Sequence, residues 1–207
     1  MPLPVRVDPF GDLHAVTDRG TVFGNRGILH DDHKRIVRPW AHQNWISCVP
    51  EFRGLHHEVM AVPPKTYTGL FFRDEATALA SGARPCFYCR RADAQAYVAA
   101  LDESLKAPEI DRRLHHERID PKARRTGSAV ASRRRLWPIE EDLPVGAMVV
   151  DEGSRVLVVT SDGPREWSFG GLGRPVQAGQ LRLLTPPTSV SALRSGYSPT
   201  SVPLIAE

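Results

Sequence analysis

The sequence predicts an α+β fold with two parts: an N-terminal domain of short helices and strands, and a small, β-barrel-like C-terminal domain. Two observations predict it. The first half of the 207-residue chain mixes β-branched segments with helical patterns, whereas from residue 143 onwards short β-rich segments alternate with turn residues. Pro and Gly are both frequent, at 18 and 16 residues, so we expect many turns and short elements rather than long helices.

The composition is typical of a globular protein from a reducing compartment. Apolar residues make up 41% and charged residues 25% of the sequence, which is enough apolar material for a packed core. No apolar run reaches the ~18 residues of a membrane span, and residues 1–6 lack a signal-peptide pattern. The three cysteines are an odd number, unlike those of a secreted disulfide scaffold. We therefore expect a cytoplasmic protein with no membrane partner.

The N-terminal part contains three predicted strands followed by two predicted helices. The strands are rich in β-branched or aromatic residues and cover residues 35–38, 44–49 and 67–72. Asp74 is suited to cap the first helix, and Gly82 stands where a left-handed residue ends it. The second helix follows over residues 92–105, where apolar residues recur at the helical period.

A helix and a basic connector follow, and then a β-rich segment. Residues 109–118 have a helical pattern, and residues 112–135 contain nine Lys or Arg against two acidic residues. Beyond them, the predicted strands are residues 147–150, 156–159, 166–169 and 181–184, and a terminal helix is predicted from Thr188. The close spacing of these strands favours a small barrel. The predicted domains are therefore residues 1–106, 107–139 and 140–207.

The segment Cys86-Phe87-Tyr88-Cys89 is the strongest chemical motif in the sequence. Thiolates at this spacing can chelate one metal ion from a tight turn, and the N-terminus of the following helix favours their anionic form. Tetrahedral zinc needs two more ligands. Cys48, at the end of a predicted strand, is the natural third ligand, and a histidine is the natural fourth. The candidate histidines are His30, His33, His56 and His57.

Two other interpretations of the cysteine pair are open. A Cys-x-x-Cys pair can be a redox centre, but that interpretation needs a βαβ context that the sequence does not show. The pair can also be two inert, buried thiols. The position at a helix start and the presence of a third cysteine favour the zinc interpretation.

Residues 75–90 resemble the second half of the Ada-type zinc domain, in which a helix ending in Gly leads into an Arg-Pro-Cys-x-x-Cys knuckle. Residues 23–30 are similar to its first half, which carries a Gly-Asn turn and a ligand histidine before a cysteine. The resemblance covers residues 23–91 and implies His30 as the fourth ligand of a structural Zn²⁺. Ada proteins use four cysteines, one of which accepts a methyl group from DNA. With three cysteines in this chain, methyl transfer is not predicted.

The connector predicts contact with DNA or RNA, because clustered guanidinium groups bind phosphates through paired hydrogen bonds and release counterions. A solvated linker explains the same charge pattern. The arginines expected to make this contact are Arg124, Arg125, Arg133, Arg134 and Arg135.

Two other functions remain open beside a zinc protein that contacts nucleic acid. One is a metal-dependent hydrolase or nuclease that uses His30 and His33, or His115 and Glu117. On a helix, however, His115 and Glu117 are two residues apart and point away from each other. The other is a protein-interaction module whose zinc is purely structural.

Overall fold

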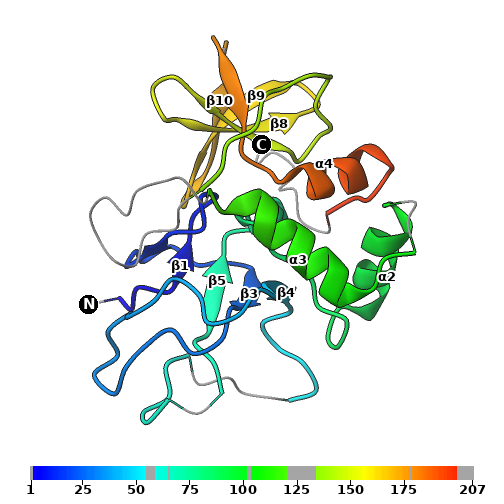
Figure 1. Ribbon diagram of the computed structural model, residues 1–207. Helices are drawn as coiled ribbons and strands as arrows, with labels where there is room; N and C mark the ends of the chain where they lie inside the picture. Colours follow the sequence, from blue (N-terminus) through cyan, green and yellow to red (C-terminus); the bar gives the residue numbers. More distant parts are fainter. Residues whose placement is uncertain are drawn as a thin grey trace.

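Two separate β-sheets and four α-helices make up the part of the chain that the structure describes (Figure 1). This computed structural model describes residues 2–54, 59–64, 66–101, 104–120, 134–177 and 179–199. The predicted α+β class is confirmed. In Figure 1 the two sheets lie one above the other, and three helices gather on one side: α2 (Arg91–Ala99), α3 (Ala107–Arg118) and α4 (Pro187–Arg194).

The N-terminal sheet has six short strands in the order β2-β1-β5-β3-β4-β6. They are β1 (Arg6–Val7), β2 (Leu13–His14), β3 (Val22–Asn25), β4 (Ile46–Cys48), β5 (Leu70–Phe72) and β6 (Arg84–Pro85). The pairs β1–β5 and β4–β6 are parallel, and the other pairs are antiparallel. Two of the predicted segments contain β4 and β5. The third, residues 35–38, forms no strand, and Ile36 only makes an isolated bridge to His30.

The C-terminal strands form an open sheet, which corrects the predicted barrel. The order is β10-β9-β8-β7-β11, with antiparallel neighbours throughout. The strands are β7 (Met148–Asp151), β8 (Val156–Thr160), β9 (Gly163–Ser168), β10 (Gly171–Pro175) and β11 (Leu181–Leu183). Helical residues Ala76 and Ala80 pack on this sheet, so its apolar face is buried without closing the sheet on itself.

Helix α1 (Glu75–Ser81) lies at the centre of the molecule. All seven of its residues are buried, as expected for a helix that packs on every side. Its predicted ends are confirmed: Asp74 Oδ1 accepts the N–H of Thr77 at 2.8 Å, and Gly82 adopts φ 90°. Three of its seven residues are alanines, and their small side chains let neighbouring elements approach closely.

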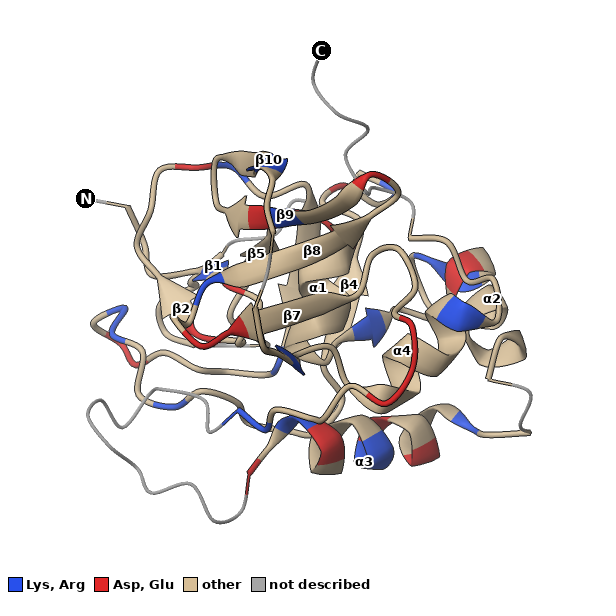
Figure 2. Ribbon diagram, turned by 90° about the horizontal axis from the view of Figure 1, so that it is seen from above, with Lys and Arg blue, Asp and Glu red and all other residues tan. Residues whose placement is uncertain are grey.

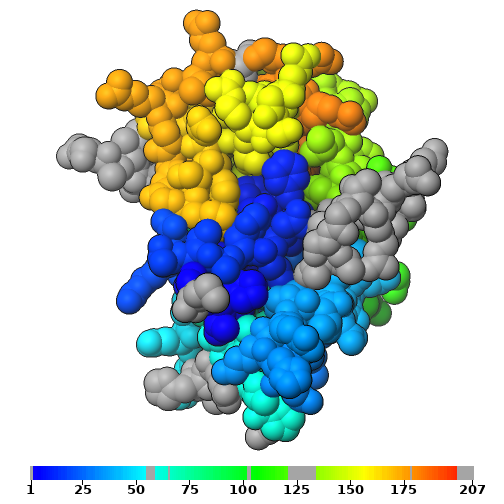
Figure 3. All heavy atoms as spheres, turned by 90° about the vertical axis from the view of Figure 1, so that its left-hand side faces the viewer, coloured from blue at the N-terminus to red at the C-terminus, as the bar shows by residue number. Residues whose placement is uncertain are grey.

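Two of the hydrophobic clusters extend across the predicted domain boundaries. One cluster joins Leu79 and Tyr97 from the N-terminal part to Ala147, Leu193 and Tyr197 from the C-terminal part. The N-terminal segments also contact the C-terminal sheet, as Figure 3 shows, where the blue segments lie directly against the yellow and orange ones. The predicted domain boundaries stay predictions, but residues from the N-terminal and C-terminal parts pack together in the same hydrophobic clusters.

Trp45 is buried between two guanidinium groups. Those of Arg26 and Arg118 each lie 3.8 Å from the indole ring. Arg26 also donates to the carbonyl oxygen of Gly11 at 2.6 Å, and Arg118 to that of Gly82 at 2.9 Å. Burial lowers the pKa of both arginines, that of Arg26 to about 9. The ring therefore contributes cation–π contacts to two desolvated charges.

None of the helices in the described ranges combines the length and the apolar content that a membrane crossing requires.

Candidate metal centre

Two parallel strands bring the cysteines together. In the pairing of β4 with β6, Ser47 lies opposite Pro85, and the N–H of Cys86 donates to the carbonyl oxygen of Ser47 at 3.0 Å. Cys48 ends β4 and Cys86 directly follows β6, so the two side chains meet at one end of the pair. Cys89 completes the turn before α2 begins at Arg91.

The geometry of the three sulfur atoms fits a tetrahedral metal ion. The Sγ atoms of Cys48, Cys86 and Cys89 all lie within 4.8 Å of one another. Zinc–sulfur bonds of about 2.3 Å in a tetrahedron place the sulfurs about 3.8 Å apart, which this spacing accommodates. All three residues are free cysteines. The structure therefore confirms a cysteine triad that can hold a metal ion.

The electrostatics of the triad favour a bound cation. Hydrogen bonds from the thiols of Cys48 and Cys89, together with backbone N–H groups of Cys89 and Tyr88, lower the pKa of Cys86. The same sulfur contacts, with burial, raise the pKa of Cys48. One thiolate thus forms at the expense of another, because neighbouring negative charges repel. A divalent cation removes this conflict and allows all three to ionise.

Arg90 supports the knuckle from inside the protein. Its guanidinium donates to Glu75 Oε2 at 2.7 Å, to Asp93 Oδ2 at 2.8 Å and to Ser47 Oγ at 3.1 Å. Tyr197 donates to the other oxygen of Glu75 at 2.5 Å. One side chain next to Cys89 thus connects β4, α1 and α2, which fixes the position of the sulfurs.

No protein-family model, curated protein or solved structure matches this chain. The part of the Ada resemblance that the structure supports is the cysteine triad.

His30 does not join the triad in this structure. Its Nδ1 lies 2.6 Å from Thr68 Oγ1, and its Nε2 lies 2.9 Å from the carbonyl oxygen of Ala61. Nε2 therefore donates and Nδ1 accepts, because a carbonyl oxygen can only accept a hydrogen bond. Both nitrogens of this buried imidazole are in use, so metal binding would cost it one of these bonds. Its observed role is to hold the segment that carries Tyr67 and Thr68.

None of the other candidate histidines is seen next to the triad among the residues that the structure describes. His33 lies in an exposed turn, where its N–H donates to Asp31 Oδ1 at 2.9 Å. His56 and His57 lie outside the described residues. Within the described ranges, the only group of three or more possible metal ligands is the cysteine triad.

His115 and Glu117 lie in separate environments and do not form a shared site. His115 Nδ1 accepts from Arg118 at 2.9 Å, and its ring stands 5.7 Å from that of Trp40. Burial and the charge of Arg118 lower its pKa to about 4. The Glu117 carboxylate accepts from the N–H and the hydroxyl of Thr188, at 3.0 and 2.7 Å, in the first turn of α4. These contacts stabilise the fold. They do not bring His115 and Glu117 together as a pair for acid–base chemistry.

The arginines expected to contact nucleic acid are only partly described. Arg124, Arg125 and Arg133 lie outside the described residues. The guanidinium of Arg134 faces inwards and donates to the carbonyl oxygens of Ala80 and Leu184. That of Arg135 lies 5.2 Å from the Trp137 ring. In Figure 2, basic and acidic residues are interspersed along α3. Contact with nucleic acid stays a prediction.

A cavity opens directly over the sulfurs. It has a volume of about 230 Å³, and all three cysteines line it. Two edge-to-face aromatic pairs border it, Phe23 with Tyr67 and Phe52 with Tyr88, with ring centroids 5.9 and 5.2 Å apart. Burial and the nearby charge of Cys48 raise the pKa of Tyr67. This aromatic lining was not predictable from the sequence because its members come from four separate segments.

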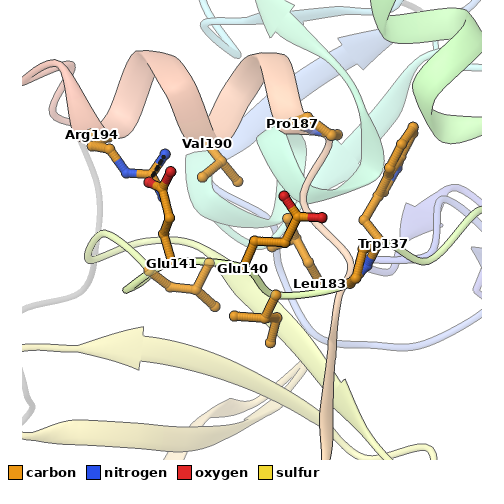
Figure 4. A pocket seen from close by; sticks show the side chains of 10 residues that line it. Trp137, Glu140, Glu141, Leu183, Pro187, Val190 and Arg194 are labelled. Atoms are coloured by element: carbon orange, nitrogen blue, oxygen red, sulfur yellow. Dashed lines mark ion pairs between the residues drawn. The ribbon is translucent and has the colours of Figure 1, made fainter.

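A larger cavity, of about 440 Å³, lies between residues 137–143 and α4, with Leu183 of β11 also in its lining (Figure 4). Its lining is mostly apolar, with Glu140 and Glu141 among the ten residues. Glu141 pairs with Arg194 at 3.2 Å. This lining includes no cysteine or histidine, so the cavity is separate from the metal centre.

Proposed function

We propose that this chain is a zinc-binding protein in which one Zn²⁺, held by the thiolates of Cys48, Cys86 and Cys89, stabilises the fold. The observation that carries this proposal is the approach of three sulfur atoms to within 4.8 Å of one another. Thiolate ligands favour zinc over the harder cations magnesium and calcium, which prefer oxygen. Such a site keeps its ligands reduced in a reducing compartment, so the proposal agrees with the expected cytoplasmic location.

The positions of the ligands explain how the metal acts on the fold. Cys48 belongs to β4, which is three residues long, and Cys86 follows β6, which has two. Strands this short contribute few hydrogen bonds, so their pairing needs further support. A metal ion that joins them also fixes the start of α2, which follows directly after Cys89 and Arg90. We expect its removal to loosen the edge of the N-terminal sheet and α2 together.

The order of elements also supports a relationship to Ada-type zinc modules. A helix ends at Gly82 in the left-handed conformation, and an Arg-Pro strand then leads into the Cys-x-x-Cys knuckle. The missing fourth cysteine separates this chain from the methyl-accepting members of that group. We therefore propose a structural metal and no methyl transfer.

Metal analysis with thermal unfolding tests the proposal. Protein purified with a thiol reductant should contain about one zinc per chain, and Cys86→Ser or Cys48→Ser should lose most of it, because two thiolates bind zinc far more weakly than three. Chelation lowers the melting temperature, since a metal that binds only the folded state contributes its binding free energy to folding.

His30→Gln is the matched control. Glutamine removes the imidazole but can keep one of the two hydrogen bonds to Thr68 and Ala61. This variant retains its zinc and loses some stability. A melting temperature that chelation leaves unchanged, or zinc that is retained in both cysteine variants, contradicts the proposed function.

A further inference from the structure

The cavity over the sulfurs is too large to be explained by the metal ion alone. Its volume is about 230 Å³, whereas one water occupies about 30 Å³ of liquid. It is also smaller than the roughly 300–1,000 Å³ of pockets that hold drug-sized ligands. The free space therefore suits a molecule of about one ring beside the metal.

The three sulfur ligands leave one tetrahedral position of zinc unfilled by the described residues. No other Cys, His, Asp or Glu side chain within the described ranges joins the triad. His30, the predicted fourth ligand, has both ring nitrogens bound elsewhere. All three cysteines line the cavity, so a small molecule in the cavity would lie next to a metal ion that the triad holds. Three protein ligands with an open position are typical of zinc sites that bind exchangeable ligands.

We propose that this fourth position binds a small, neutral nitrogen donor of the imidazole class, which enters the aromatic cavity and coordinates the metal directly. This inference rests on the proposed function, since it needs the metal to be present.

The charge of the site selects a neutral donor. Three thiolates and one divalent cation carry a net charge of −1, and an anionic ligand would raise it to −2 beside apolar walls, which is costly. A neutral aromatic heterocycle adds no charge, and its ring can contact the rings of Phe23, Phe52, Tyr67 and Tyr88.

The walls also provide an entrance and a polar group. Tyr88 is 67% exposed, so the cavity reaches the surface at its ring. Asn25 lines the cavity, and its Oδ1 accepts the N–H of Gly27 at 2.7 Å. Its amide nitrogen is therefore the end that can donate to the second nitrogen of a bound imidazole.

Cobalt substitution with imidazole titration tests this proposal. Co²⁺ bound to thiolates shows sulfur-to-cobalt charge-transfer bands, and its visible d–d bands report on the fourth ligand. We expect imidazole to shift the d–d bands in a saturable manner while the charge-transfer bands persist. Val49→Phe, which fills the cavity, should weaken imidazole binding by about tenfold or more. Val145→Phe, the same exchange at an exposed position outside the cavity, should leave the affinity unchanged.

Two results would overturn the inference. One is a d–d spectrum that does not respond to imidazole, which means that a protein side chain closes the site. The other is equal affinity in the Val49→Phe and Val145→Phe variants, which means that imidazole does not use this cavity. Failure of the proposed function looks different, because no charge-transfer bands appear when the thiolates bind no metal.

Discussion

Breaking the ion pair between Arg84 and Asp111 should destabilise the protein strongly. Arg84 Nε and Nη2 donate to the two oxygens of Asp111, each at 2.8 Å. The two side chains are only 7% and 10% exposed, and they join β6, just before Cys86, to α3. Removing one partner leaves the other charge buried and unpaired, which typically costs about 3–5 kcal/mol. Asp111→Asn keeps the shape of the side chain and removes its charge, so the loss measures mainly this electrostatic effect.

Urea unfolding of the variants measures the effect. Asp111→Asn should lower the free energy of unfolding by about 3 kcal/mol with an unchanged urea dependence. Glu141→Gln is the matched control, because its pair with Arg194 is exposed and such pairs contribute about 0–1 kcal/mol. The double variant Arg84→Met with Asp111→Leu should recover most of the loss, since no buried charge remains. An Asp111→Asn variant as stable as the Glu141→Gln variant would refute this reasoning.

Three further predictions concern the helices and the central tryptophan. His115 stays neutral in the folded state because its pKa is lowered to about 4, whereas in the unfolded chain it takes up a proton below about pH 6.5. Stability should therefore fall as the pH drops from 6.5 to 4, and His115→Gln should reduce this fall in melting temperatures recorded against pH. Glu117→Gln weakens the charged contact with Thr188 at the start of α4 and should cost about 1–2 kcal/mol in urea unfolding, with no change in zinc content. Trp45→Ala removes the ring between two buried guanidinium groups and should cost about 3–5 kcal/mol, again by urea unfolding.

The sequence was most informative where local chemistry decides the structure. The ends of α1 were predictable because Asp74 and Gly82 act through their own backbone neighbourhood. The pair Cys86 and Cys89 was predictable in the same way, since both residues lie in one tight turn. Such signals do not depend on distant parts of the chain.

Features that depend on tertiary packing were not predictable. Strands β1 and β2 have two residues each, too few for any alternation to stand out. The C-terminal sheet stays open because α1 packs on it from a distant segment, a contact that strand spacing cannot reveal. His30 stands in a ligand-like position in the sequence, but Thr68 and Ala61 reach it from more than 30 residues away.

X-ray absorption at the zinc edge tests the central claim most directly. The zinc-loaded protein should show three sulfur neighbours at about 2.3 Å and one nitrogen or oxygen neighbour at about 2.0–2.1 Å. This shell corresponds to Cys48, Cys86 and Cys89 with one further ligand. A shell of nitrogen and oxygen atoms without sulfur would contradict the account, because it would place the zinc away from the cysteine triad.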